Sequence, residues 1–270
     1  MFEDFKKVIS EELDSYNELG CCKAARELAE SSKQEFNYKK FPHYFTGDLE
    51  ADLVMINLNP KDGKGGYEKF SNWEEYSEFY SSFGRRKHIE EEGFKSRFDE
   101  NQLCFYKGFG GIEFLDDNDG KNKEAFKQNL ARVIDSKLQL ELIPYASNNF
   151  KWEGLSKEHL DRQIERLLDI ITAKERKYIL FCGSQFVKLL EPYRIDKNRS
   201  SNIYETRLIK STGEPVKGNY SFHNITLKYK DTILEAGIAQ SYASQALHGY
   251  LKKDYGAFCR ECWNKEHNNK

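Results

Sequence analysis

The chain has 270 residues, with 42 Lys and Arg residues against 44 Asp and Glu residues and a formal net charge of -2. This length allows one sizeable α/β core or a core with a large insertion, and we expect a single domain over residues 1–270. The charge balance excludes a global basic field of the kind that attracts nucleic acid. A local basic patch remains compatible with it.

Nothing in the sequence predicts a membrane or secreted protein. The N-terminal stretch MFEDFKKVISEELDSY carries charge in every turn, and no apolar run reaches the roughly 18 residues that cross a bilayer. We therefore expect a cytoplasmic protein without a membrane partner. Its six cysteines fit reduced thiols better than a disulfide framework in that compartment.

The first part of the chain predicts helices followed by a buried strand. Residues 1–32 carry apolar side chains at helical spacing, which indicates two amphipathic helices separated near Gly20. The apolar run from Leu53 to Ile56 is typical of a strand buried on both faces. Residues 67–120 are rich in aromatic and charged residues and predict a helical insertion packed over one end of the sheet.

The rest of the chain alternates expected strands with expected helices. Further strands are expected at Lys137 to Tyr145, Lys177 to Ser184 and, more weakly, His223 to Lys230. Helical patterns occupy Glu124 to Ile134 and His159 to Ala173. This alternation predicts an α/β fold, a three-layer sandwich whose central, mostly parallel sheet is flanked by helices.

Two remaining segments have a different character. The polar, turn-rich stretch from Glu191 to Ser221 predicts a loop or an added hairpin. Residues 264–270 predict a disordered tail.

A polar turn follows the first predicted strand. Asn57, Asn59 and Pro60 come directly after it, at the end where open α/β sheets form their ligand crevice, and a glycine-rich loop comes next. An ordinary turn would use the same residues, because turn chemistry favours Asn and Pro.

The surrounding sequence favours the functional interpretation. YFTGDLEADLVMINLNPK, from Tyr44 to Lys61, resembles the first motif of the uracil-DNA glycosylase superfamily. The resemblance implies that Asn59 positions the attacking water, and Asn57 stands where the family usually has glycine. The resemblance extends to about Leu251 and implies the fold of that superfamily.

A second motif of this superfamily matches LELIPY. The family reads the flipped base from the end of a strand, commonly with an asparagine, and here Glu141 takes that place, three residues before Pro144. A carboxylate only accepts hydrogen bonds, so Glu141 would favour a cytosine-type base, which presents an amine where uracil presents an acceptor. Alternatively, Glu141 faces outward or binds a lysine, since a one-residue slip reverses the strand face.

The third motif is degraded. GIAQSYASQALHG, from Gly237 to Gly249, keeps the family's spacing of two serines at Ser241 and Ser244 but lacks the histidine that stabilises the departing base. Gln240 is the remaining donor near that place. His248 is a further candidate, although a histidine on the surface of a helix is the simpler interpretation.

The other candidates surround these motifs. Base stacking would fall to Tyr67, Phe70 and Tyr145, all of which are equally suited to a core. Contacts to DNA phosphates would come from Lys61, Lys64, Arg85, Arg86 and Lys87. The basic cluster GRRKH also fits a solvated face.

The resemblance implies a monofunctional DNA glycosylase that works as a monomer without a cofactor and acts on a modified cytosine in phage DNA, as an antiviral defence. Two alternatives are a non-catalytic nucleic-acid or partner-binding protein of the same fold and a nucleoside or nucleotide hydrolase. We expect no metal, although Cys259, Cys262 and His267, with Cys21 or Cys22, offer a possible zinc set. Cys104 and Cys182 instead indicate that cysteine serves here as a small apolar residue.

Overall fold

The computed structural model describes residues 2–63, 68–196, 201–204, 220–240 and 249–267. The chain divides into two compact units, each built from discontinuous segments. The first comprises residues 1–83 and 137–177, and the second comprises residues 84–136 and 178–270. The expected insertion at 67–120 is therefore shared between the units, and the expectation of one domain stays a prediction.

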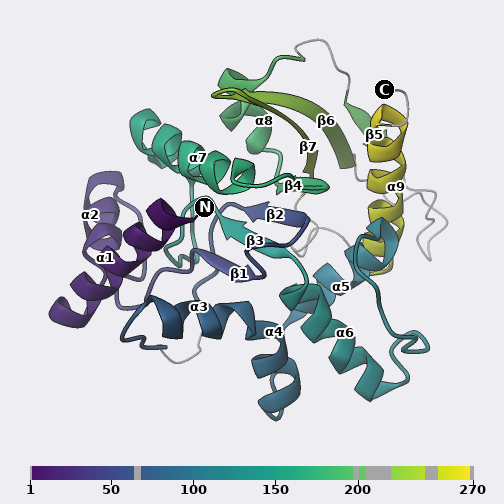
Figure 1. Ribbon diagram of the computed structural model, residues 1–270, viewed down its shortest axis with the longest axis horizontal. Coiled ribbons are helices and arrows are strands. Elements are labelled where there is room, and N and C mark those ends of the chain that lie inside the picture. Colours follow the sequence, from purple (N-terminus) through teal and green to yellow (C-terminus); the bar gives the residue numbers. More distant parts are fainter. Residues whose placement is uncertain (1, 64–67, 197–200, 205–219, 241–248, 268–270) are drawn as a thin grey trace. The chain divides into compact units, whose positions relative to one another are not determined.

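The first unit is α/β. Its helices are α1 (Glu3–Leu19), α2 (Lys23–Ser32), α3 (Trp73–Ser81) and α7 (Lys157–Thr172), with a 3-10 turn η2 (Trp152–Gly154). Its strands are β1 (Phe45–Gly47), β2 (Leu53–Asn57) and β3 (Leu138–Glu141), in the order β1-β3-β2 (Figure 1). β3 pairs antiparallel with β1 and parallel with β2.

Local signals explain most of these elements. α1 ends at Gly20, whose φ of 68° is a left-handed conformation that glycine adopts without strain, and this is the break expected between the two helices. α7 begins at Ser156, whose side chain accepts a hydrogen bond from the His159 N–H. β2 is buried from Leu53 to Ile56, as expected of a strand covered on both faces.

The second unit is also α/β. Its helices are α5 (Arg97–Phe109), α6 (Lys123–Asp135), α8 (Phe186–Leu189) and α9 (Gly249–His267), with a π-helix η1 (Arg86–Glu90) and a 3-10 turn η3 (Glu191–Tyr193). The short helix α4 (Phe83–Arg85) lies at the boundary in sequence. Its strands are β4 (Tyr178–Cys182), β5 (Asn202–Tyr204), β6 (Tyr220–Tyr229) and β7 (Thr232–Ala239), in the order β4-β7-β6-β5 (Figure 1).

The structure confirms the α/β class and corrects four details. Within the two units, the described pairings are parallel for β2–β3 and β4–β7 but antiparallel for β1–β3, β5–β6 and β6–β7, so the sheet is mixed rather than mostly parallel. β7 was not expected, because its interior Glu235 interrupts the apolar pattern. β3 ends at Glu141, well before Tyr145, since Pro144 has no N–H for a ladder. α9 continues to His267, so residues 264–267 are helical rather than disordered.

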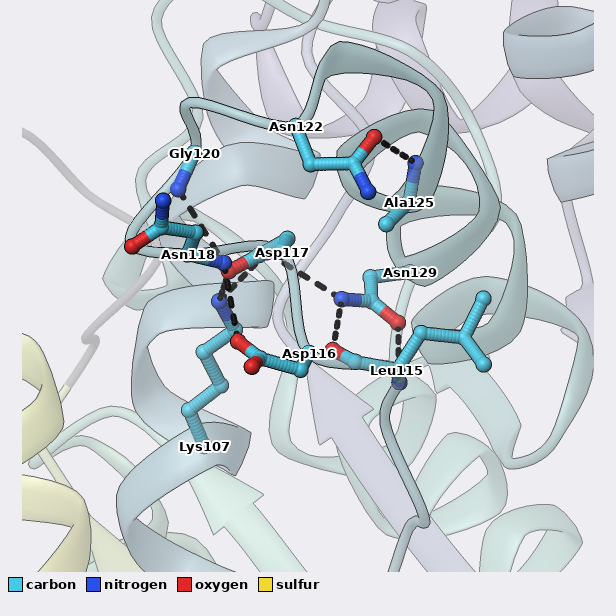
Figure 2. Close-up of polar contacts among 9 residues, drawn as sticks. All are labelled: Lys107, Leu115, Asp116, Asp117, Asn118, Gly120, Asn122, Ala125 and Asn129. Atoms are coloured by element: carbon cyan, nitrogen blue, oxygen red, sulfur yellow. Dashed lines mark hydrogen bonds and ion pairs between the residues drawn. The ribbon is translucent and has the colours of Figure 1, made fainter.

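A polar cluster in the second unit stabilises the loop between α5 and α6 (Figure 2). The buried carboxylate of Asp117 accepts hydrogen bonds from Lys107 Nζ at 2.6 and 2.7 Å and from Asn129 Nδ2 at 3.1 Å. Asn129 also bonds both main-chain polar groups of Leu115, at 2.8 and 2.9 Å. Asp117 and Asn129 thus have partners for their buried polar atoms, and the cluster has a structural role.

Within the described residues, no helix combines the length and the apolar character needed to cross a membrane.

Candidate functional site

The candidate site lies in the first unit, where two parallel strands end side by side. The register of β2 and β3 places Asn57 opposite Glu141, at the carboxyl end of both strands. The pairing continues beyond the strands: Ile143 N–H donates to the Leu58 carbonyl at 2.9 Å, and Ser147 N–H donates to the Pro60 carbonyl at 3.1 Å. The structure therefore places the ends of the two strands that carry these motifs side by side.

Glu141 is buried at this edge, with only 2% of its surface exposed. Its Oε1 atom accepts hydrogen bonds from Asn57 Nδ2 at 3.1 Å and from Gln139 Nε2 at 3.0 Å. Its Oε2 atom is also buried but has no hydrogen-bond partner among the described residues. An unpaired buried oxygen is costly unless a water, a ligand or a proton completes its hydrogen bonding.

The surroundings of Glu141 favour its neutral form. Burial raises the pKa of Glu141 from 4.5 to about 7, while the hydrogen bonds from Asn57 and Gln139 and the charge of Lys137 act in the opposite direction. A carboxyl group with this pKa is both a donor and an acceptor near neutral pH. The expectation from the sequence that Glu141 only accepts hydrogen bonds therefore applies to its ionised form alone.

Polar residues alternate along β3 and the residue just before it, an arrangement that sequence reasoning missed. Lys137, Gln139 and Glu141 share one face of the strand because successive side chains alternate between faces. Lys137 Nζ donates to Gln139 Oε1 at 3.4 Å, and both side chains are buried. The alternation in the letters KLQLE was the available signal.

Helix α7 supports the end of β3 through Arg166. One nitrogen, Nη2, donates to the main-chain oxygens of Glu141 at 3.0 Å and of Leu142 at 2.9 Å. The guanidinium carbon also lies 4.9 Å from the centre of the Tyr44 ring, within cation–π distance. Arg166 thereby fixes the backbone from which the Glu141 side chain projects.

Asn59 is half-buried, and no hydrogen bond joins its side chain to that of Glu141. Its Nδ2 atom donates to the carbonyl of Pro60 at 3.0 Å, within its own turn. Beyond this turn, Asp62 forms an ion pair with Lys40 at 2.9 Å and accepts hydrogen bonds from Asn37 at 3.1 Å. The loop that carries Asn59 and the half-buried Pro60 is therefore anchored on both sides.

The aromatic candidates lie in the core of the first unit. Phe70 is buried and packs edge-on against Phe41 and Tyr76 at 5.9 and 5.2 Å between ring centres. Tyr145 is buried as well, and its hydroxyl donates to Glu12 Oε1 at 3.0 Å. Tyr67 lies outside the described residues.

Glu12 is a half-buried carboxyl that the sequence did not single out. It accepts hydrogen bonds from Tyr145 and, at 3.7 Å, from the thiol of Cys22. Burial raises the pKa of Glu12, and the hydrogen bonds and the charge of Arg166 oppose that shift. The signal for this residue was one acidic position on the apolar face of α1, next to Leu13.

The third motif belongs to the second unit. Gln240 follows β7, and its main-chain N–H donates to the Tyr255 hydroxyl at 2.8 Å. Ser241, Ser244 and His248 lie outside the described residues.

The basic candidates are largely held by neighbouring acids. Arg85 pairs with Glu90 at 3.4 Å, and Lys87 pairs with Glu91 at 2.8 Å. Arg86 is half-buried in η1, and Lys61 is exposed in the first unit. Lys64 lies outside the described residues.

The described residues offer no arrangement that is typical of a metal-binding site. Among the described residues, no group of three or more His, Cys, Asp or Glu side chains is arranged to hold a metal ion. Cys259 and Cys262 are buried on α9, where burial raises the pKa of the Cys259 thiol and raises that of Cys262 to about 11. These thiols are therefore protonated at neutral pH.

The fold and the site define an α/β protein in which the buried side-chain carboxyl of Glu141 lies where two parallel strands end. The raised pKa of this group lets it bind a proton near neutral pH. No protein-family model, curated protein or solved structure matches this chain. A functional conclusion must therefore come from the chemistry of the site and from the motifs in the sequence.

Proposed function

We propose that this protein is a monofunctional DNA glycosylase with a uracil-DNA-glycosylase-like fold. The observation that carries the proposal is the Asn57–Glu141 pair, in which a buried carboxyl oxygen without a described partner lies at the joint end of two parallel strands. Ligand crevices form at this edge in open α/β sheets. The sequence motifs independently point to the same two strand ends.

The proposed reaction is hydrolysis of an N-glycosidic bond. Water attacks the anomeric carbon of a flipped nucleotide, the bond to the base breaks, and its electron pair leaves with the base, which then takes up a proton. Asn59 orients the water, since it lies two residues beyond Asn57 on an anchored loop. Asn57 and Glu141 bind the edge of the base, and the neutral carboxyl of Glu141 stabilises charge as the base departs.

An excision assay tests this proposal. The protein is incubated with single- and double-stranded oligonucleotides that contain uracil, cytosine or a modified cytosine, and abasic sites are scored by alkaline cleavage. We expect excision from at least one substrate, and a loss of about 100-fold or more in Asn59→Ala, the size found when one positioned polar group is removed from an active site. Asn148→Ala is the matched control, because Asn148 is an exposed asparagine in the loop after β3.

The outcome of the excision assay distinguishes the proposed function from its alternatives. No abasic sites with any base, or full activity in Asn59→Ala, would refute the proposal. Binding of the oligonucleotides without cleavage would favour a non-catalytic protein of the same fold. Hydrolysis of free nucleosides but not of DNA would favour a nucleoside hydrolase.

A further inference from the structure

The hydrogen bonds from Lys137 to Gln139 and from Gln139 to Glu141 determine which carboxyl oxygen of Glu141 can bind a ligand. An ammonium group only donates hydrogen bonds, so Lys137 requires the oxygen of the Gln139 amide to face it. The NH₂ group of Gln139 must then face Glu141, where it donates to Oε1. Reversing the amide would place two donors together at Lys137, so the contact with Lys137 sets the orientation.

This orientation distinguishes the two carboxyl oxygens. Oε1 accepts from both Gln139 and Asn57 and is thereby occupied as an acceptor. When Glu141 is neutral, its proton therefore resides on Oε2, the atom without a described partner. When Glu141 is ionised, the same atom becomes an acceptor.

We propose that Lys137 and Gln139 are positioning residues that leave Oε2 as the sole ligand-facing atom of Glu141, so that its protonation selects the base. The neutral acid donates to a base with a carbonyl oxygen at the contacted position, as in uracil. The carboxylate accepts from a base with an amine there, as in cytosine. This inference rests on the proposed function for its ligand, but the placement of the proton stands on the side-chain contacts.

The charged groups that face this carboxyl are defined within the described part of the first unit. Lys137, directly before β3, is the charged side chain that acts on the carboxyl, and Arg166 of α7 bonds the main-chain oxygen of Glu141. β2 contributes the neutral amide of Asn57, and β1 contributes Thr46, opposite Gln139. Loss of the Lys137 charge or of the Gln139 donor therefore favours the neutral form of Glu141.

A titration of Glu141 tests the positioning without any substrate. The protein is labelled with carbon-13 at the glutamate carboxyl, and Glu141 is identified as the resonance missing in Glu141→Gln. We expect Lys137→Met and Gln139→Met each to raise the midpoint by about one pH unit. Lys151→Met, which removes an exposed lysine from the same unit, should leave it unchanged.

An unchanged midpoint in the folded variants, or a wild-type midpoint at the ordinary glutamate value, would overturn the inference. If Lys137→Met does not fold, Gln139→Met decides, because methionine closely matches glutamine in size. A wild-type protein that excises no base contradicts the proposed function and leaves this titration interpretable.

Substrate choice gives the second readout. The ratio of uracil excision to cytosine-type excision should fall up to about tenfold for each pH unit above the midpoint, in step with the neutral fraction of Glu141. Glu141→Gln carries an NH₂ donor in the place of Oε2, so it should keep the low-pH preference at every pH. A ratio that is independent of pH in an active wild-type enzyme would contradict the selection step.

Discussion

At the scale of single residues, two buried carboxyl groups of the protein differ in how their oxygens are paired. Asp117 is a buried carboxylate that is paired with Lys107 and Asn129. Glu141 has two amide donors on one oxygen and none described on the other. Burial of a charge without full compensation is unfavourable, so Glu141 lowers the stability of its own fold when it ionises.

This reasoning predicts how stability depends on pH. Below about pH 4.5 the carboxyl is neutral in both states, and between about 4.5 and 7 only the unfolded state ionises, so the folded state loses stability as the pH rises. Above about pH 7 the loss is complete and amounts to about 3 kcal/mol, from a shift of about 2.5 pKa units at 1.36 kcal/mol each.

Glu141→Gln should remove this loss, since its amide mimics the neutral acid. The free energy of unfolding of the variant, relative to wild type, should therefore rise by up to about 3 kcal/mol between about pH 4 and pH 8. Urea unfolding at several pH values measures the difference. A difference that is constant with pH would mean that Glu141 titrates alike in the folded and unfolded chain.

At the scale of elements, the end of β3 is held by β2 on one side and by α7 through Arg166. We expect Arg166→Met to lower the free energy of unfolding by about 2 kcal/mol, because two main-chain oxygens lose a charged donor. Arg162→Met is the matched control, since Arg162 lies on the same helix but is exposed.

Urea unfolding of both variants measures this contribution. Equal stability of the two would show that Arg166 adds nothing to the end of β3. Excision by Arg166→Met, measured at a pH where it is folded, separates loss of stability from loss of positioning.

Local signals predicted some of the elements but not β1, β7 or α9, and non-local pairing set a further limit. α1, α2, α6 and α7 follow from apolar periodicity, and the break at Gly20 follows from the backbone freedom of glycine. Sequence reasoning placed Asn57 and Glu141 each at the end of a strand, but their contact depends on the register of β2 with β3. The contact between Arg166 and β3 depends on how a helix packs, and the pKa of Glu141 depends on burial, neither of which a linear pattern contains.

At the scale of the whole molecule, a net charge of -2 provides no long-range attraction for DNA. Binding to DNA would therefore depend on a local group of cations. In the second unit, η1 begins with Arg86 directly after Arg85, and Arg85 lies 3.4 Å from Glu90 at an exposed position. Lys87 is more firmly held, between Glu91 and the ring of Phe94.

The contacts of Arg85 and Lys87 favour Arg85 over Lys87 as a phosphate contact, and the adjacent Arg86 remains the second candidate from the sequence. An exposed ion pair contributes little to stability, so Arg85 exchanges Glu90 for a phosphate at small cost. The slope of log K against log salt should therefore decrease by about two in the Arg85→Ala/Arg86→Ala variant, since each phosphate contact contributes about 0.9. The control is Lys7→Ala/Lys23→Ala, which removes two exposed lysines paired along their own helices and should leave the slope unchanged. Fluorescence anisotropy with a labelled duplex over a range of salt concentrations measures the slopes, and equal slopes for the two double variants would remove Arg85 and Arg86 from the DNA-binding surface.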